Sequence, residues 1–168
     1  NILQMAGVVF LDETVESDDQ LTRIIIERKV DWVGSSDGSL DEGVGGEGHV
    51  TLRVAKEGVT LAALGLSPLG RRASSYGPET KGLVRSIRKL TFCCSAAGAS
   101  LSGRRPVALL TTDSKSALVM CQNTSAKSPD DEELLVVLNQ LAVVADVARV
   151  LIDGIGALCR PAREYHDP

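Results

Sequence analysis

The chain has 168 residues, of which 43% are hydrophobic and 3% aromatic, so it can bury one core built mainly from aliphatic side chains. Its formal net charge of −4 argues against a general polyanion binder, because nonspecific affinity for nucleic acid depends on neutralisation of phosphates by lysine and arginine. No apolar run approaches the roughly 20 residues of a membrane span, so we expect no membrane partner.

Residues 1–29 combine an apolar segment, an acidic segment and a run of three isoleucines, without a recognisable motif. We interpret them as an N-terminal arm that packs on the following domain or on a partner. The domain itself is predicted to span residues 30–168.

Short strands dominate the next part of the chain. The first is expected to run into a turn at Ser36–Ser39, and the second and third are separated by a turn at Lys56–Gly58, where glycine favours a hairpin. Apolar residues alternate with polar ones in the second strand, as in a half-buried sheet. The expected strands cover residues 30–35, 50–54 and 59–66.

Helices alternate with strands after residue 75. Pro78 suits the first turn of a helix, and the apolar residues that follow it recur at helical spacing. Two further helices are expected at 114–123 and 128–144, and near-continuous apolar runs at 107–112 and 148–152 are typical of buried strands. This order predicts an α/β fold with a mixed five-stranded sheet, three antiparallel strands and then two parallel ones, covered by helices on both faces.

Three carboxylates stand where this topology makes chain segments converge. Asp37 ends the first strand, Glu79 opens the first helix and Asp113 ends the buried strand. Groups at strand ends and at adjoining helix starts meet along one edge of an open sheet. Gathered carboxylates repel one another, and Mg²⁺ or Mn²⁺ would relieve that repulsion. Each acid also has a simple structural interpretation on its own, as a turn residue, a first-turn acid or a helix cap.

Three stretches resemble the ribonuclease H family: Ser36-Asp37-Gly38-Ser39, residues 74–79 and residues 111–118. They are most similar to the ribonuclease H domains of trypanosomatid non-LTR retrotransposons, which would make this chain a domesticated copy. The family's last motif is matched more loosely, by a strand at 148–152 and then Pro161, Glu164 and Asp167. The resemblance extends from Val30 to the C-terminus.

The resemblance implies a ribonuclease H-like fold in which Asp37, Glu79, Asp113 and Asp167 are catalytic residues and ligands of two Mg²⁺ or Mn²⁺ ions. The implied reaction is hydrolysis of the RNA strand of an RNA/DNA hybrid. The chain departs from the family pattern in three ways. Ala157 stands where the family has a histidine, Gly77-Pro78 replaces Arg-Ala before the glutamate, and the family's C-terminal helix has no counterpart after Asp167.

Contacts with nucleic acid are expected on two surfaces. The backbone at Gly38 and Ser39 lies beside the acids, and the first helix carries basic residues opposite its apolar side. This basic side is equally well interpreted as a solvated helix face. The basic residues are Lys81, Arg85, Arg88 and Lys89.

Two functional hypotheses follow. The first is an active ribonuclease H-like nuclease whose partner is an RNA/DNA hybrid. The second is a catalytically impaired protein of the same fold that serves as a structural or RNA-binding subunit of a ribonucleoprotein assembly, for example a mitochondrial ribosome-type complex, with structured RNA and protein subunits as partners. A third, weaker hypothesis is a protein-binding adaptor without metal. We expect an intracellular location, in the nucleus or the mitochondrion.

Overall fold

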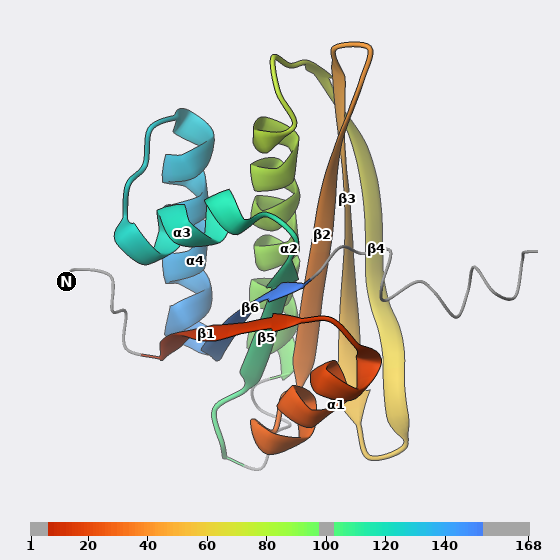
Figure 1. Ribbon diagram of the computed structural model, residues 1–168. Coiled ribbons are helices and arrows are strands. Elements are labelled where there is room, and N and C mark those ends of the chain that lie inside the picture. The colour runs from red at the N-terminus through yellow and green to blue at the C-terminus, as the bar shows by residue number, and fades with distance from the viewer. Residues whose placement is uncertain (1–6, 98–102, 153–168) are drawn as a thin grey trace, which may run out of the picture.

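The computed structural model describes residues 7–97 and 103–152 (Figure 1). In these ranges, one sheet of six strands has the order β1-β6-β5-β2-β3-β4. The strands are β1 (Val8–Val15), β2 (Trp32–Asp41), β3 (Val44–Ala55), β4 (Gly58–Arg71), β5 (Val107–Thr112) and β6 (Asp146–Ile152). The helices are α1 (Asp18–Glu27), α2 (Tyr76–Ala97), α3 (Lys115–Asn123) and α4 (Pro129–Val144).

The sheet is mixed, as predicted. β2, β3 and β4 form an antiparallel meander, whereas β2 pairs in parallel with β5 and β5 in parallel with β6. The predicted strand number is one too low, because residues 8–15 of the expected arm add β1, which pairs in parallel with β6. The arm therefore packs on the domain as an edge strand followed by a helix.

Helices cover both faces of the sheet, and each face has its own core. α2, α3 and α4 lie on one face, where Leu83, Ile87 and Leu90 of α2 pack with Leu138 and Leu141 of α4. α1 lies on the opposite face (Figure 1). Here Ile24 of α1 packs on alternate strand residues, which are Leu11, Val15, Val33, Leu109, Ala148, Val150 and Ile152. None of the described helices is both long and apolar enough to cross a membrane.

Serine side chains begin three of the helices. Ser17 forms a capping box with Gln20 at the start of α1, and the hydroxyls of Ser114 and Ser128 accept hydrogen bonds from the first turns of α3 and α4. Three acidic residues follow Ser128, where they are stabilised by the positive end of the helix dipole. The helices predicted at 114–123 and 128–144 are confirmed.

The predicted turn at Ser36–Ser39 is wrong, because these residues continue β2 and pair with residues 46–49 of β3. The second strand was predicted at 50–54, yet β3 begins at Val44 and includes the glycines at 45, 46 and 48. The third strand is longer than predicted and reaches Arg71. The result is a long, glycine-rich ribbon beside the end of β5.

Candidate functional site

The pairing of β2 with β5 places two of the predicted acids side by side. Ser35 pairs with Thr111 in this parallel ladder, and Asp37 and Asp113 each follow two residues later. Side chains two residues apart in a strand point to the same face. Asp37 and Asp113 therefore extend from two neighbouring central strands, just beyond the end of their parallel ladder, as the sequence predicted.

Two glycines bring Glu79 to the same place. A Cβ atom on Gly38 would lie 2.2 Å from the backbone nitrogen of Glu79, and one on Gly82 would lie 3.2 Å from the carbonyl oxygen of Asp37. Because neither residue has a side chain, the first turns of α2 rest directly on β2. The role of Gly82 was not apparent from the sequence, and Gly38 was interpreted only as a turn residue and a nucleic-acid contact.

The three carboxylates influence one another. Partial burial raises the pKa of Asp37, and the negative charge of Asp113 raises it further, against a hydrogen bond from the backbone of Gly38. Partial burial likewise raises the pKa of Glu79. The hydroxyls of Ser114 and Ser75 oppose this rise, whereas Asp113 and Asp37 add to it. Asp37, Glu79 and Asp113 thus form one electrostatically coupled group, which we call the acidic cluster.

One oxygen of the acidic cluster lacks a partner within the described residues. Oδ1 of Asp113 is buried and accepts no hydrogen bond there. A buried carboxylate oxygen without a donor is energetically unfavourable, and a cation could satisfy it. The all-oxygen donor set suits a hard divalent ion such as Mg²⁺. However, no three His, Cys, Asp or Glu side chains of the described ranges are arranged so that they could hold a metal ion as they lie.

The fourth predicted ligand, Asp167, lies outside the described residues, as does Ala157. The structure therefore brings together Asp37, Glu79 and Asp113 and does not test the placement of the fourth acid.

The basic residues predicted to contact nucleic acid are partly engaged within the protein. Nζ of Lys81 lies 2.8 Å from Oε1 of Glu133, and Nη1 of Arg85 lies 3.0 Å from Oε1 of Glu47, whose side chain is fully buried. Arg88 makes only a long 3.9 Å contact with Glu133, and Lys89 is exposed. Of the predicted basic face, Arg88 and Lys89 are the residues best placed to contact a ligand.

One hollow adjoins the acidic cluster, and a second is lined by residues that follow Asp113 in the chain. The first, of about 530 Å³, extends from Asp37 and Ser39 over β3 to Leu66, and glycines at 45, 46 and 48 line it. The second, of about 600 Å³, lies toward α3 and α4 and is lined by Tyr76, Lys115 and Lys127 among others. The two lysines were not apparent as ligand contacts from the sequence. The position of Lys115, two residues after Asp113, is the signal that could have indicated one of them.

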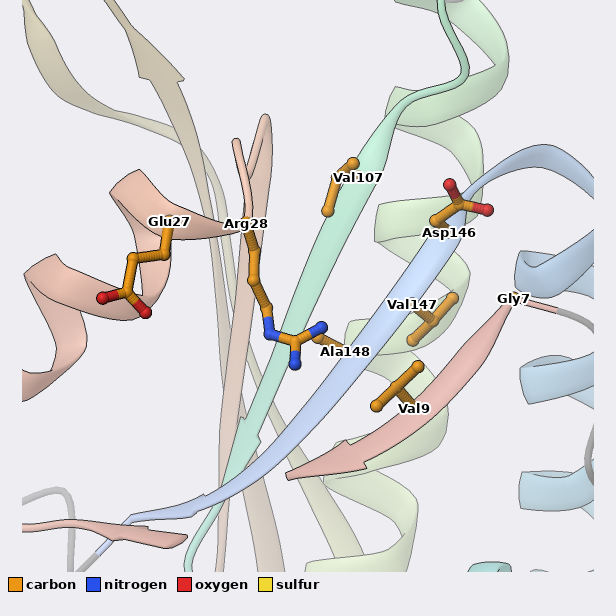
Figure 2. Close-up of a pocket in the computed structure, with 8 residues that line it drawn as sticks. All are labelled: Gly7, Val9, Glu27, Arg28, Val107, Asp146, Val147 and Ala148. Carbon is orange, nitrogen blue, oxygen red and sulfur yellow. The ribbon is translucent and has the colours of Figure 1, made fainter. Parts of the chain in front are cut away.

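A third hollow, of about 640 Å³, is lined by none of the three acids (Figure 2). Val107 and Asp146, at the first residues of β5 and β6, line it, so it lies at the opposite ends of these strands from the acids. Figure 2 shows the guanidinium group of Arg28 extending over the sheet near Ala148. The acids of the candidate site do not line this hollow, which is therefore not part of that site.

Known structures resemble this architecture more clearly than known sequences do. No protein-family model matches the chain, and no curated protein matches it significantly. LC11-RNase H1, isolated from compost by a metagenomic approach, superposes with a TM-score of 0.55 at 14% identity, over 78% of this chain and 90% of the other. The same enzyme in complex with an RNA/DNA hybrid gives a TM-score of 0.53 at 17% identity, over 72% and 84%.

The chain has a ribonuclease H fold. The fold class predicted from the three motifs is confirmed, with β1 as a sixth strand. A ribonuclease H domain from the N-terminus of a Mycobacterium tuberculosis protein, solved as a fusion with maltose-binding protein, is 22% identical over 73% of this chain and 86% of that one, with a TM-score of 0.48. In this ribonuclease H fold, the acidic cluster lies where β2, β5 and the start of α2 meet.

Proposed function

We propose that this chain is a ribonuclease H-like nuclease that hydrolyses the RNA strand of RNA/DNA hybrids at the acidic cluster. The observation that carries this proposal is the convergence of Asp37, Glu79 and Asp113, with a buried Asp113 oxygen that lacks a partner within the described residues. The shared fold with LC11-RNase H1, a protein solved in complex with such a hybrid, supports the choice of substrate.

Asp37, Glu79 and Asp113 would hold one or two Mg²⁺ or Mn²⁺ ions, together with Asp167. Such ions activate water and stabilise the leaving oxygen of a phosphodiester. The protein's own part is to hold the carboxylates in place. The hydroxyls of Ser114 and Ser75 favour the charged form of Glu79 by lowering its pKa, and the close contact at Gly38 fixes the helix that carries it.

The hollow beside Asp37 and the hollow toward α3 and α4 would receive the two sides of the hybrid. In the first hollow, glycines leave the surface bare, so a sugar–phosphate backbone can approach β3 closely, and Ser39 offers a hydroxyl. In the second, Lys115 and Lys127 would neutralise phosphates. These contacts read shape and charge rather than base sequence, as expected for an enzyme that acts on A-form-like duplexes. Arg88 and Lys89 would extend the basic surface along α2.

A second candidate is a catalytically impaired subunit of a ribonucleoprotein assembly. Two observations favour it: Lys81 and Arg85 are engaged in internal ion pairs, and within the described residues no three ligands are arranged to hold a metal ion as they lie. Descent from a retrotransposon domain fits either candidate. So does the location in the nucleus or the mitochondrion that we expect from the sequence.

The deciding experiment is cleavage of a hybrid with an end-labelled RNA strand in Mg²⁺ or Mn²⁺. The wild type is compared with Asp113→Asn and with a matched control, Asp41→Asn, which changes an exposed aspartate at the end of β2 outside the cluster. We expect cuts by the wild type and the control and none by Asp113→Asn.

Binding of the uncleaved hybrid is measured in parallel. Binding without cleavage by the folded wild type would favour the ribonucleoprotein subunit. Neither binding nor cleavage would overturn the proposal of nuclease function.

A further inference from the structure

β4 is an edge strand with an unusual surface. It pairs only with β3 among the described strands, so the backbone groups on its other side are unpaired there. Four large apolar residues on it are exposed: Val59, Leu61, Leu64 and Leu66 keep 52%, 62%, 68% and 80% of their surface. An edge of this kind is a template for a further strand.

The other edge of the sheet is protected in the usual ways. β1 carries Asp12 and Glu13, and its pairing with β6 is irregular between Phe10 and Thr14. Charges and irregular pairing both discourage the addition of a strand. β4 has no charged residue between Gly58 and Gly70, and only Pro68 interrupts its donors. The pairing of β4 with β3 is also irregular, between Leu61 and Ala63 and between Pro68 and Gly70. The two edges therefore differ in charge, not in the regularity of their pairing.

We propose that β4 is the interface of a symmetric dimer, in which a second copy of this chain adds its own β4 in antiparallel orientation. Two-fold antiparallel pairing places residues at the axis beside their own counterparts, and residues away from the axis beside residues from the other end of the strand. A charge near the axis would then face a like charge, which is destabilising, whereas the uncharged stretch from Gly58 to Gly70 avoids this cost. This inference is independent of the proposed nuclease function.

Two charges that flank the uncharged stretch fix the register: Glu57, in the turn before β4, and Arg71, its last residue. Leu64 lies midway between Glu57 and Arg71, since 64 − 57 = 7 and 71 − 64 = 7. A two-fold axis at Leu64 therefore sets Glu57 of each copy beside Arg71 of the other. Neither residue makes an ion pair within the described part of the chain. Because Pro68 lacks an N–H group, the ladder is expected to run from Leu61 to Ser67, which is centred on the same residue.

The oligomeric state tests this directly. Sedimentation velocity of the full chain over a roughly hundredfold range of concentration should show a monomer–dimer equilibrium without larger species, because a two-fold interface closes on itself. Leu64→Lys places two like charges at the axis and should raise the dimer dissociation constant by about tenfold or more. Phe92→Lys, which changes an equally exposed residue on α2, should leave the constant unchanged.

A charge exchange tests the register and provides a second variant if Leu64→Lys folds poorly. Glu57→Arg should weaken the dimer, and the double variant Glu57→Arg with Arg71→Glu should restore it. A monomeric wild type at every concentration would overturn the proposal. So would a dimer that Leu64→Lys leaves intact, open-ended assembly, or a double variant no better than Glu57→Arg alone.

Discussion

Gly38 lies directly beneath the backbone nitrogen of Glu79, at a distance that leaves no room for a Cβ atom. The strand that carries one acid of the cluster and the helix that carries another are therefore in backbone contact. This contact depends on a missing side chain, and it links the stability of the fold to the geometry of the site.

Gly38→Ala should separate α2 from β2. A methyl group 2.2 Å from a backbone nitrogen cannot be accommodated without movement of the helix, and overpacking of this kind costs about 1–3 kcal/mol. Urea unfolding would measure the loss. The matched control is Gly77→Ala in the same helix, where a Cβ would meet nothing closer than 3.5 Å and alanine favours the helix. Equal destabilisation by both variants would contradict the close-packing explanation.

Asp113→Asn should lower the pKa values of both Asp37 and Glu79. The charge of Asp113 is one cause of the raised pKa at each of these carboxyls, and asparagine removes that charge while keeping the shape of the side chain. Titration of the carboxyl carbons by NMR would follow both groups. Unchanged pKa values in the variant would show that burial alone is responsible and that the three acids do not form one coupled group.

Without divalent cations, the acidic cluster should make stability depend on pH. A carboxyl whose pKa is higher in the folded state adds stability below its unfolded pKa, and this contribution is lost as pH rises through the folded pKa. For Asp37, whose ordinary value is 3.8, the loss falls above that value. Asp37→Asn should therefore be more stable than the wild type at about pH 7 in EDTA, and this advantage should shrink as pH falls toward 3.8 and be lost below that value. A difference that does not vary with pH would rule out the cluster as its source.

Divalent cations should reverse this effect. Binding to the folded state alone raises the free energy of unfolding by about 2.7 kcal/mol when the ion is at a hundredfold excess over its dissociation constant. Thermal unfolding in Mg²⁺ or Mn²⁺ should thus show a higher Tm for the wild type and for Asp41→Asn. Asp113→Asn should show little change. A similar rise in all three proteins would indicate a general ionic effect instead of a site.

Replacement of Arg85 should lower the free energy of unfolding more than replacement of Arg88, which lies one turn later on α2. Arg85→Ala would leave His49 as the remaining partner of the fully buried carboxylate of Glu47, and loss of a partner at a buried acceptor costs about 1–3 kcal/mol. Arg88→Ala, at a residue whose side chain is 60% exposed, should change stability by less than about 0.5 kcal/mol. Comparable urea midpoints for the two variants would contradict a structural role for Arg85.

The parts of the fold that local signals determine were predictable from the sequence. Serine caps, acidic first turns and helical spacing of apolar residues predicted α2, α3 and α4, and continuous apolar runs predicted β5 and β6. β1 was missed because its partner is remote: Val8 pairs with Val147, and nothing near Val8 indicates that pairing. Gly38 was misinterpreted because Asp-Gly is a common turn sequence, whereas here the glycine serves close packing of α2 on β2.

The candidate site shows the same division. The convergence of Asp37 and Asp113 follows from strand order and was predicted, since each acid lies two residues beyond the last pair of the parallel β2–β5 ladder. The engagement of Lys81 and Arg85 was not, because their partners Glu133 and Glu47 come from α4 and β3. Whether a charged side chain on a helix forms an ion pair depends on the helices and strands that pack beside it. These neighbours are set by the tertiary structure and cannot be identified from the sequence of the helix.

The pairing of β1 with β6 joins the first strand to the last one described. Since a chain is synthesised from its N-terminus, β1 emerges from the ribosome long before the strand it pairs with exists. Closing so long a loop is entropically costly, and folds with such distant contacts form slowly. The meander of β2, β3 and β4 can form early. Until β6 has been synthesised, however, β1 has no strand to pair with, and its apolar residues are exposed to solvent. Nascent chains that have not yet reached Val147 should therefore bind holdase chaperones through this N-terminal segment.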